Sequence, residues 1–244
     1  MLQGKIAFIT GGSRGIGAAV AIRLASDGAD IALTYHSDRQ AAEKVADAIT
    51  ALGRKADIQQ IDVADAERLR AAVDDAANRL GGLDILVNNA GIAPMGPFTD
   101  ATVTEIDRIL AVHPRATMIA SQAAATHLAT GGRIINIGSS LARTVPYPGV
   151  AMYAMSKSAL IGLTKGMAQD LAPRDITVNL VHPGSTDTDM NPADGPDADA
   201  ERAVAALRRY CTPEDIAATV AHLAGPYGRN ITGTEFAVDA GFGG

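Results

Sequence analysis

Short apolar segments alternate with alanine-rich segments along the chain, and this alternation constrains the fold more than any other feature. The apolar segments lie at 5–10, 30–35, 56–61, 84–87, 133–138, 176–182 and 234–238. They are apolar throughout rather than at every second residue, which is typical of strands covered on both faces. Strands that alternate with helices form a parallel sheet with right-handed crossovers. We therefore predict an α/β fold with a doubly wound, parallel, seven-stranded sheet and helices on both faces.

Length and charge exclude several classes of protein. A length of 244 residues fits one domain, residues 1–244. The 21 basic and 27 acidic residues are scattered and give a net charge of −6, so we expect neither a nucleic-acid nor an anionic-membrane partner. No apolar run approaches the roughly 18 residues of a membrane span, and no signal peptide or metal site is expected. The single cysteine, Cys211, fits a cytoplasmic protein.

Capping signals mark two of the predicted helices, and one long segment has no period. Thr102 with Glu105 forms a capping box, and Thr212 followed by Pro213 marks another helix start. The stretch from Gly184 to about residue 199 is rich in Asp, Pro, Thr and Gly. Loops of this length are often functional lids, so we expect a substrate loop at about 184–209.

A glycine-rich turn follows the first predicted strand. The sequence Thr-Gly-Gly-Ser-Arg-Gly-Ile-Gly at 10–17 opens a helix that runs to about Gly28. Glycine is needed where the backbone turns sharply and approaches a pyrophosphate, and the helix N-terminus then supplies free N–H groups. An ordinary strand-to-helix turn is the alternative. The position at the first turn of a β-α-β unit favours a dinucleotide site.

Further motifs follow in order along the chain. They are Asp62-Val63, Asn88-Asn89-Ala90-Gly91, Asn136-Ile137-Gly138-Ser139, Tyr153 with Lys157, and Pro183-Gly184 with Thr188. Together with the glycine turn they resemble the short-chain dehydrogenase/reductase family from about Lys5 to the C-terminus. The resemblance implies a Rossmann-like fold and a nicotinamide cofactor.

The resemblance also implies the residues that bind this cofactor. They are Gly11, Ser13, Arg14, Gly15, Ile16, Gly17, Tyr35, His36, Ser37, Asp62, Val63, Asn89, Ala90, Gly91, Tyr153, Lys157, Pro183, Gly184, Thr186 and Thr188.

The end of the second predicted strand bears on the choice of nicotinamide. Members that prefer NAD carry an acidic residue there, whereas this chain reads Thr-Tyr-His-Ser at 34–37. Arg14 and Ser37, with Arg39 as a further candidate, would bind a 2′-phosphate by charge-assisted hydrogen bonds. We therefore expect NADP(H) to be preferred over NAD(H). If both arginines are merely solvated, the choice stays open.

Tyr153 and Lys157 lie four residues apart, so on a helix they share one face. A nearby ammonium favours the phenolate, which would bring Tyr153 towards the pH at which it exchanges a proton. Such a pair alone is common on helix surfaces. The resemblance implies that Tyr153 is the acid/base, that Lys157 holds the cofactor ribose and tunes the tyrosine, and that a serine polarises the carbonyl.

Two serines compete for that last role. Ser139 ends a predicted strand fourteen residues before Tyr153, whereas Ser140 has the commoner family spacing of thirteen. The sheet fixes the end of a strand, but the following loop can absorb an extra residue. We therefore assign Ser139 to the carbonyl and Ser140 to hydrogen bonding within the loop.

The fourth predicted helix departs from the family pattern. Family members usually carry an asparagine in its middle that helps to hold a water chain leading to the lysine, and this chain has His113 there. Pro114 removes a helical N–H and is expected to kink the helix. His113 is either a member of a proton relay, since its ordinary pKa lies near neutrality, or a structural residue at an irregular turn. The structural role is the favoured one of the two.

The implied function is the interconversion of a ketone or aldehyde and an alcohol by hydride transfer, with a small carbonyl or alcohol as the partner. A 3-oxoacyl-carrier-protein reductase is one alternative. Asp187, Asp189, Asp194, Asp197 and Asp199 make the loop acidic, which argues against so anionic a substrate.

A second alternative is a nucleotide sensor. The run at 183–196 resembles a branch of the family that includes a bacterial biofilm-dispersal mediator proposed to bind a cyclic dinucleotide. The retained Ser139, Tyr153 and Lys157 favour chemistry instead. The resemblance also implies a homotetramer, with the fourth helix and the Tyr153 helix in one interface and Phe236–Gly244 near a second.

Overall fold

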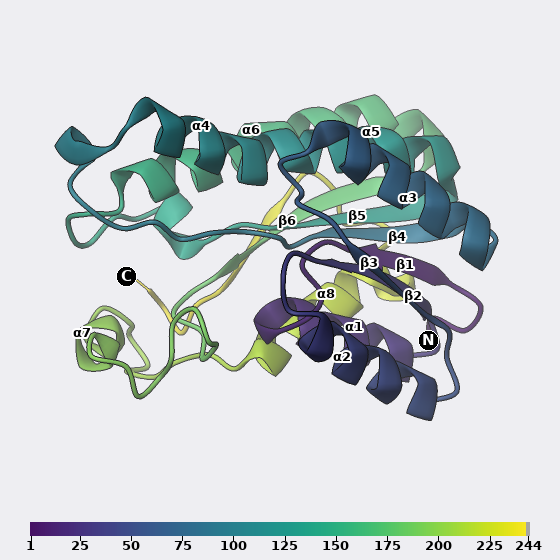
Figure 1. Cartoon of the computed structure of the whole chain (residues 1–244), viewed down its shortest axis with the longest axis horizontal. Coiled ribbons are helices and arrows are strands. Elements are labelled where there is room, and N and C mark those ends of the chain that lie inside the picture. Colours follow the sequence, from purple (N-terminus) through teal and green to yellow (C-terminus); the bar gives the residue numbers. More distant parts are fainter. Residues whose placement is uncertain (243–244) are drawn as a thin grey trace.

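A computed structural model describes residues 1–242 and contains the predicted parallel sheet, in the order β3-β2-β1-β4-β5-β6-β7 (Figure 1). The strands are β1 (Ile6–Ile9), β2 (Asp30–Tyr35), β3 (Ala56–Gln60), β4 (Leu83–Asn88), β5 (Leu128–Ile137), β6 (Thr177–Pro183) and β7 (Glu235–Val238). The predicted fold class and strands are confirmed. β5 begins five residues earlier than its apolar signal because Gly131 and Gly132 interrupt that signal, and a register shift accompanies its pairing with β4.

Helices cover both faces of the sheet (Figure 1). One face carries α1 (Gly15–Ser26), α2 (Arg39–Ala51) and α8 (Pro213–Ala224). The other carries α3 (Ala66–Leu80), α5 (Ala116–His127) and α6 (Ala151–Leu171), with α4 (Val103–Leu110) leading into α5. The short α7 (Ala198–Ala203) lies inside the predicted substrate loop. Single 3-10 turns occupy Phe98–Asp100, Ser140–Ala142, Ala172–Arg174 and Pro226–Gly228.

The strand order determines where a ligand can bind. β1 pairs with β2 on one side and with β4 on the other, so the chain leaves β1 and β4 towards opposite faces of the sheet. Ligands of such sheets bind in the crevice at this switch point, beyond the carboxyl ends of the strands. The glycine turn follows β1 and the segment Asn89–Gly91 follows β4, so both predicted motifs meet at this crevice.

Pro114 changes the helical geometry between α4 and α5. The residues Ala111–Arg115 form a turn of π-helix at the place where the sequence predicts a kink. Proline lacks the N–H that an α-helix requires of its interior residues, and the wider turn accommodates that loss. The turn also points the His113 side chain into the protein, where it is 1% exposed.

Among residues 1–242, no helix combines the length and the apolar character needed to cross a bilayer. In the same residues, no three side chains of His, Cys, Asp or Glu gather as a metal site requires. Gly243 and Gly244, at the end of the segment expected near a second subunit interface, lie outside the described residues.

The two predicted helix starts are observed with their side-chain caps. The Thr102 hydroxyl accepts a hydrogen bond from the Glu105 N–H at 3.2 Å, and the Glu105 carboxylate accepts one from the Thr102 N–H at 2.9 Å. Thr212 and Asp215 make the same reciprocal pair at the start of α8. These bonds satisfy N–H groups that have no partner within the helix.

We predict that Thr102→Ala lowers the free energy of unfolding by about 1 kcal/mol, because it removes one half of the capping box. Denaturant titration followed by circular dichroism measures the change. Thr102→Ser keeps the hydroxyl and is the matched control. Equal losses in both variants would show that the methyl group, and not the cap, stabilises this helix.

Candidate active site

One cavity of about 780 Å³ lies at the switch point and brings the predicted motifs together. Every predicted cofactor-binding residue from Gly11 to Thr188 lines it, and Ser139 lines it as well. The segments come from distant parts of the sequence and meet because the carboxyl ends of parallel strands share one edge of the sheet. Among the residues predicted to act in catalysis, His113 does not line the cavity, since it lies behind the cavity wall.

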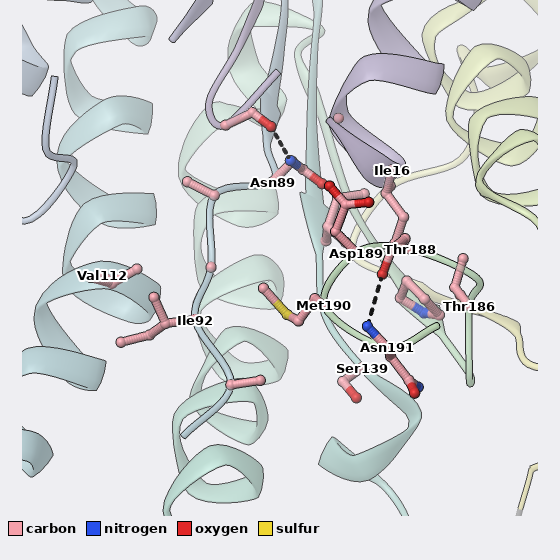
Figure 2. A pocket seen from close by; sticks show the side chains of 18 of the residues that line it. Ile16, Asn89, Ile92, Val112, Ser139, Thr186, Thr188, Asp189, Met190 and Asn191 are labelled. Atoms are coloured by element: carbon pink, nitrogen blue, oxygen red, sulfur yellow. Dashed lines mark hydrogen bonds between the residues drawn. The ribbon is translucent and has the colours of Figure 1, made fainter. Parts of the chain in front are cut away.

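Asn89 holds the glycine turn against the end of β4. Its amide nitrogen donates to the carbonyl oxygens of Thr10 at 3.1 Å and Gly11 at 2.9 Å. The Thr10 hydroxyl accepts hydrogen bonds from the backbone N–H groups of Asn89 and Ala90. Figure 2 shows Asn89 on the cavity wall. A Cβ at Gly17 would lie 2.2 Å from the Gly11 oxygen. The turn therefore requires glycine at position 17 for its close approach.

The N-terminus of α1 faces the cavity without a side-chain cap. Arg14 is the N-cap residue, and its side chain makes no capping bond. By contrast, Asp38, Asp65, Thr102 and Thr212 cap α2, α3, α4 and α8. Free N–H groups at a helix N-terminus together with the helix dipole attract phosphate. The residues present therefore fit the pyrophosphate of a dinucleotide.

The end of β2 forms the part of the cavity where a 2′-phosphate is expected. His36 and Ser37 line it, and Arg14 also lines the cavity, with 60% of its side chain exposed and its Nη1 4.0 Å from the Asp189 carboxylate. Arg39 does not line the cavity; its Nε instead donates to Glu43 at 2.8 Å. The proposed contribution of Arg39 is therefore not supported. Asp38 also lines the cavity, but one of its carboxylate oxygens accepts the Ala41 N–H at 2.9 Å as a helix cap.

Arg108 lines the cavity beside Asp62, although no sequence motif indicated it. Its Nη1 donates to Asp62 at 2.8 Å, and the second carboxylate oxygen accepts the Ala64 N–H at 2.9 Å. Burial alone would raise the pKa of Asp62, but the hydrogen bonds from Arg108 and Ala64 outweigh it and lower the pKa. Only the three-dimensional contact between α4 and the end of β3 identifies this pair.

Tyr153, Lys157 and Ser139 meet at the inner end of the cavity. The Lys157 Nζ is 5.8 Å from the centre of the Tyr153 ring and donates to the Ile137 carbonyl at 3.0 Å. Burial lowers the pKa of Lys157 to about 8. Burial raises the pKa of Tyr153 to about 12, and a hydrogen bond with the Ser139 side chain opposes this shift. In the protein alone, burial therefore raises the pKa of the phenol, whereas the sequence led us to expect a pKa lowered by the ammonium.

Ser140 has a different partner. Its hydroxyl donates to the Asp239 carboxylate at 2.8 Å, which fixes the loop after β5 to the chain after β7. The Ser139 hydroxyl accepts the Leu141 N–H at 3.2 Å and remains within reach of Tyr153. The two serine hydroxyls thus have different partners, and only Ser140 is engaged with the Asp239 carboxylate.

His113 is fixed by hydrogen bonds on both ring nitrogens. Its Nε2 accepts the Ile92 N–H at 3.0 Å, so the proton is assigned to Nδ1, which lies 2.8 Å from the Ser156 hydroxyl. The Ser156 hydroxyl in turn donates to the Tyr153 carbonyl at 2.7 Å. Burial, and secondly the charge of Lys157, lower the pKa of His113 to about 2. This arrangement favours the structural role over the proton relay.

The substrate loop contributes residues that no sequence motif indicated. Glu201 of α7 accepts hydrogen bonds from the Ser185 hydroxyl and, at 3.2 Å, from the Tyr147 hydroxyl. Met190 and Asn191 also line the cavity, and Figure 2 shows them beside Thr188 and Asp189. Their positions depend on how the loop folds back over the sheet edge, which local sequence does not determine.

We predict that His113→Asn leaves the shape of the pH profile of kcat unchanged between pH 5 and 9, because a ring with a pKa of about 2 does not titrate there. Steady-state assays over that range, with stability measured in parallel, provide the test. Ser156→Ala, which removes the partner of Nδ1, is the control for the loss of the hydrogen-bond chain. If the pH profile of kcat shifts in His113→Asn but not in Ser156→Ala, the proton-relay interpretation would be restored.

Comparison with known proteins places this geometry in a family. Residues 11–243 match the family model described as Enoyl-(Acyl carrier protein) reductase. The chain is 42% identical to the cyclic-di-GMP-binding biofilm dispersal mediator protein of Escherichia coli, with 98% of each chain covered.

Solved structures of similar sequence point to the same family. A short chain dehydrogenase from Burkholderia cenocepacia in complex with NADP is 57% identical, with a TM-score of 0.97 and 98% of each chain covered. A short-chain dehydrogenase/reductase from Serratia marcescens is 53% identical, with a TM-score of 0.98 and coverage of 100% and 99%. The chain thus belongs to the short-chain dehydrogenase/reductase family.

Proposed function

We propose that the protein reduces a ketone or aldehyde to an alcohol with NADPH. The observation that carries this proposal is the meeting of Tyr153, Lys157 and Ser139 at the inner end of a cavity whose outer part fits a dinucleotide. Bound NADPH supplies the hydride. The chain itself supplies a proton donor, a cation and a carbonyl-polarising hydroxyl.

Tyr153 is suited to donate a proton. With a pKa of about 12, the phenol is neutral at physiological pH and holds the proton that a developing alkoxide needs. Alcohol oxidation would require the opposite state, a phenolate. The raised pKa therefore keeps Tyr153 in the protonated form that carbonyl reduction requires.

Lys157 and Ser139 assist at neighbouring atoms. The Lys157 ammonium is fixed by the Ile137 carbonyl, which leaves its other N–H groups to hold a ribose hydroxyl. The Ser139 hydroxyl lies beside the phenol and can donate to the same substrate oxygen. Two fixed donors at one oxygen stabilise the charge that develops there in the transition state.

The substrate part of the cavity combines apolar and acidic side chains. Met95, Tyr147 and Met190 give it apolar surface, while Asp197 and Glu201 add negative charge. Such a lining favours a neutral carbonyl compound over a carrier-protein thioester. The substrate is therefore proposed as a small, uncharged ketone or aldehyde.

The relationship to the cyclic-di-GMP-binding protein supports a second candidate, a nucleotide sensor on the same fold. A panel of ketones and aldehydes with both reduced cofactors, together with calorimetry against cyclic-di-GMP, separates the two functions. Carbonyl-dependent NADPH oxidation supports the reductase. Tight cyclic-di-GMP binding with no turnover on any carbonyl would favour the sensor.

A homotetramer in the cytoplasm is proposed on the family resemblance. Met118 on α5 and Met155 on α6 are 41% and 46% exposed, and burial of such side chains would favour association of these helices. Light scattering coupled to size exclusion gives the mass directly.

We predict that Ser139→Ala lowers kcat for carbonyl reduction by about 10²- to 10³-fold, because it removes a donor to the developing oxyanion. Ser140→Ala is the matched control and stays close to wild type, since that hydroxyl serves the loop. Tyr153→Phe, measured in the same assay, removes the proton donor. Loss of activity in Ser140→Ala alone would reverse the assignment of the two serines.

We predict that the protein prefers NADPH to NADH and that Arg14→Ala lowers the ratio of the two kcat/KM values by about 10- to 100-fold, the worth of a charge-assisted hydrogen bond. Arg39→Ala is the control, since Arg39 pairs with Glu43 away from the cavity. A wild-type preference for NADH would refute the cofactor assignment.

A further inference from the structure

His182 is buried directly beneath the serine that faces the substrate. It is the residue before Pro183 on β6, and its side chain is 0% exposed. The β5–β6 ladder ends at the pair Ile137 and Val181, so His182 lies where the next strand contact would be. Its ring fills that place and contacts the backbone of Ser139, with Nδ1 3.2 Å from the nitrogen and 2.8 Å from the oxygen.

The hydrogen-bond partners determine which ring nitrogen carries the proton. Nε2 lies 3.2 Å from the Glu235 carboxylate, which only accepts hydrogen bonds when ionised, so the proton is assigned to Nε2. Burial lowers the pKa of His182 and disfavours a second proton on Nδ1. With the proton on Nε2, Nδ1 accepts the Ser139 N–H at 3.2 Å, and the Ser139 carbonyl oxygen, 2.8 Å from the same nitrogen, takes its hydrogen bond from elsewhere.

The Ser139 backbone needs such an acceptor. Its carbonyl already accepts the Ala142 N–H at 3.0 Å. Its N–H, in contrast, has no hydrogen-bond acceptor other than His182 within the part of the chain that the structure describes. An unpartnered buried N–H is costly, so the ring and the N–H satisfy each other.

Gly138 gives independent evidence that this contact is close. A Cβ at Gly138 would lie 2.6 Å from Nδ1 and 3.0 Å from Cε1 of His182. Its conformation is not the left-handed one that itself requires glycine. The glycine before Ser139 therefore provides the space that the imidazole occupies.

On its other side the ring is held by a chain of contacts that reaches the surface. Glu235 on β7 accepts from Nε2 with one carboxylate oxygen and lies 2.8 Å from the Lys165 Nζ with the other. Lys165 is on α6, the helix that also carries Tyr153 and Lys157. An imidazole that only filled space would be better replaced by an apolar side chain, because a buried polar ring is costly unless both nitrogens are bonded.

We propose that His182 is a positioning residue, which accepts the Ser139 N–H at Nδ1 and so holds the Ser139 hydroxyl at the substrate oxygen. The inference rests on the proposed carbonyl reduction. His182 touches neither the cavity nor the reacting atoms, so it acts only through Ser139. Its loss should affect the chemical step and leave cofactor binding intact.

Two substitutions separate the functions of the two ring nitrogens. His182→Asn places an amide oxygen near the position of Nδ1 and keeps the acceptor for Ser139, but it loses Glu235. His182→Gln places its amide near the position of Nε2 and keeps Glu235, but it loses the Ser139 N–H. Gln lacks one and Asn lacks two of the six heavy side-chain atoms of His, so thermal unfolding of each variant is measured to account for the difference in packing.

We expect His182→Gln to lower kcat about 10- to 100-fold with the KM for NADPH unchanged, the cost of a displaced catalytic group, and His182→Asn to restore most of kcat. Equal kcat values in the two variants would overturn the proposal. Ser139→Ala is measured beside them. If Ser139→Ala retains full activity, the proposed role of Ser139 fails instead.

A spectroscopic test on the wild-type protein does not depend on turnover or on the folding of a variant. In protein labelled with ¹⁵N-histidine, the His182 Nδ1 is expected at the chemical shift of a nitrogen that carries a lone pair, and Nε2 at that of a protonated nitrogen. A proton on Nδ1 at neutral pH would contradict the proposal.

A Gly138→Ala variant, whose Cβ displaces the ring, should lower kcat as His182→Gln does.

Discussion

The contact between Asn89 and the turn after β1 is the interaction on which the site depends. Two hydrogen bonds from one amide to the Thr10 and Gly11 carbonyls join the ends of β1 and β4. Successive strands are added on one side of β1 up to β3 and on its other side from β4 onwards. Together with the hydrogen bonds that the Thr10 hydroxyl accepts from the N–H groups of Asn89 and Ala90, the two bonds from the Asn89 amide fix the glycine turn relative to β4. The uncapped end of α1, the cavity and the strand ends beyond it all take their positions from this junction.

Burial determines the protonation of the groups at the inner end of the cavity. It keeps Tyr153 protonated and His113 neutral, and it brings the pKa of Lys157 down to about 8. Each of these groups also has a fixed hydrogen-bond partner, so their positions are set before any substrate arrives. Preorganised donors of this kind stabilise developing charge without reorganisation during the reaction.

The sequence predicted the strands, the glycine turn and the Tyr153 helix because each depends on local spacing. Apolar runs indicate buried strands, and glycines indicate sharp turns. The i, i+4 spacing of Tyr153 and Lys157 indicates that the two side chains share one face of a helix. The contacts of Glu201 with Tyr147 and of His182 with Ser139 join residues more than forty positions apart and have no local pattern. The π-turn at Pro114 was anticipated only as a kink, because proline specifies the loss of an N–H and not how the helix accommodates it.

The central claim of carbonyl reduction is tested most directly by following the hydride. With NADPH carrying deuterium at the transferring position of its nicotinamide and a ketone that the protein turns over, we predict one deuterium at the carbinol carbon of the alcohol for each NADPH oxidised. Oxidation of NADPH that leaves the alcohol carbon unlabelled, or the absence of any alcohol, would contradict the account.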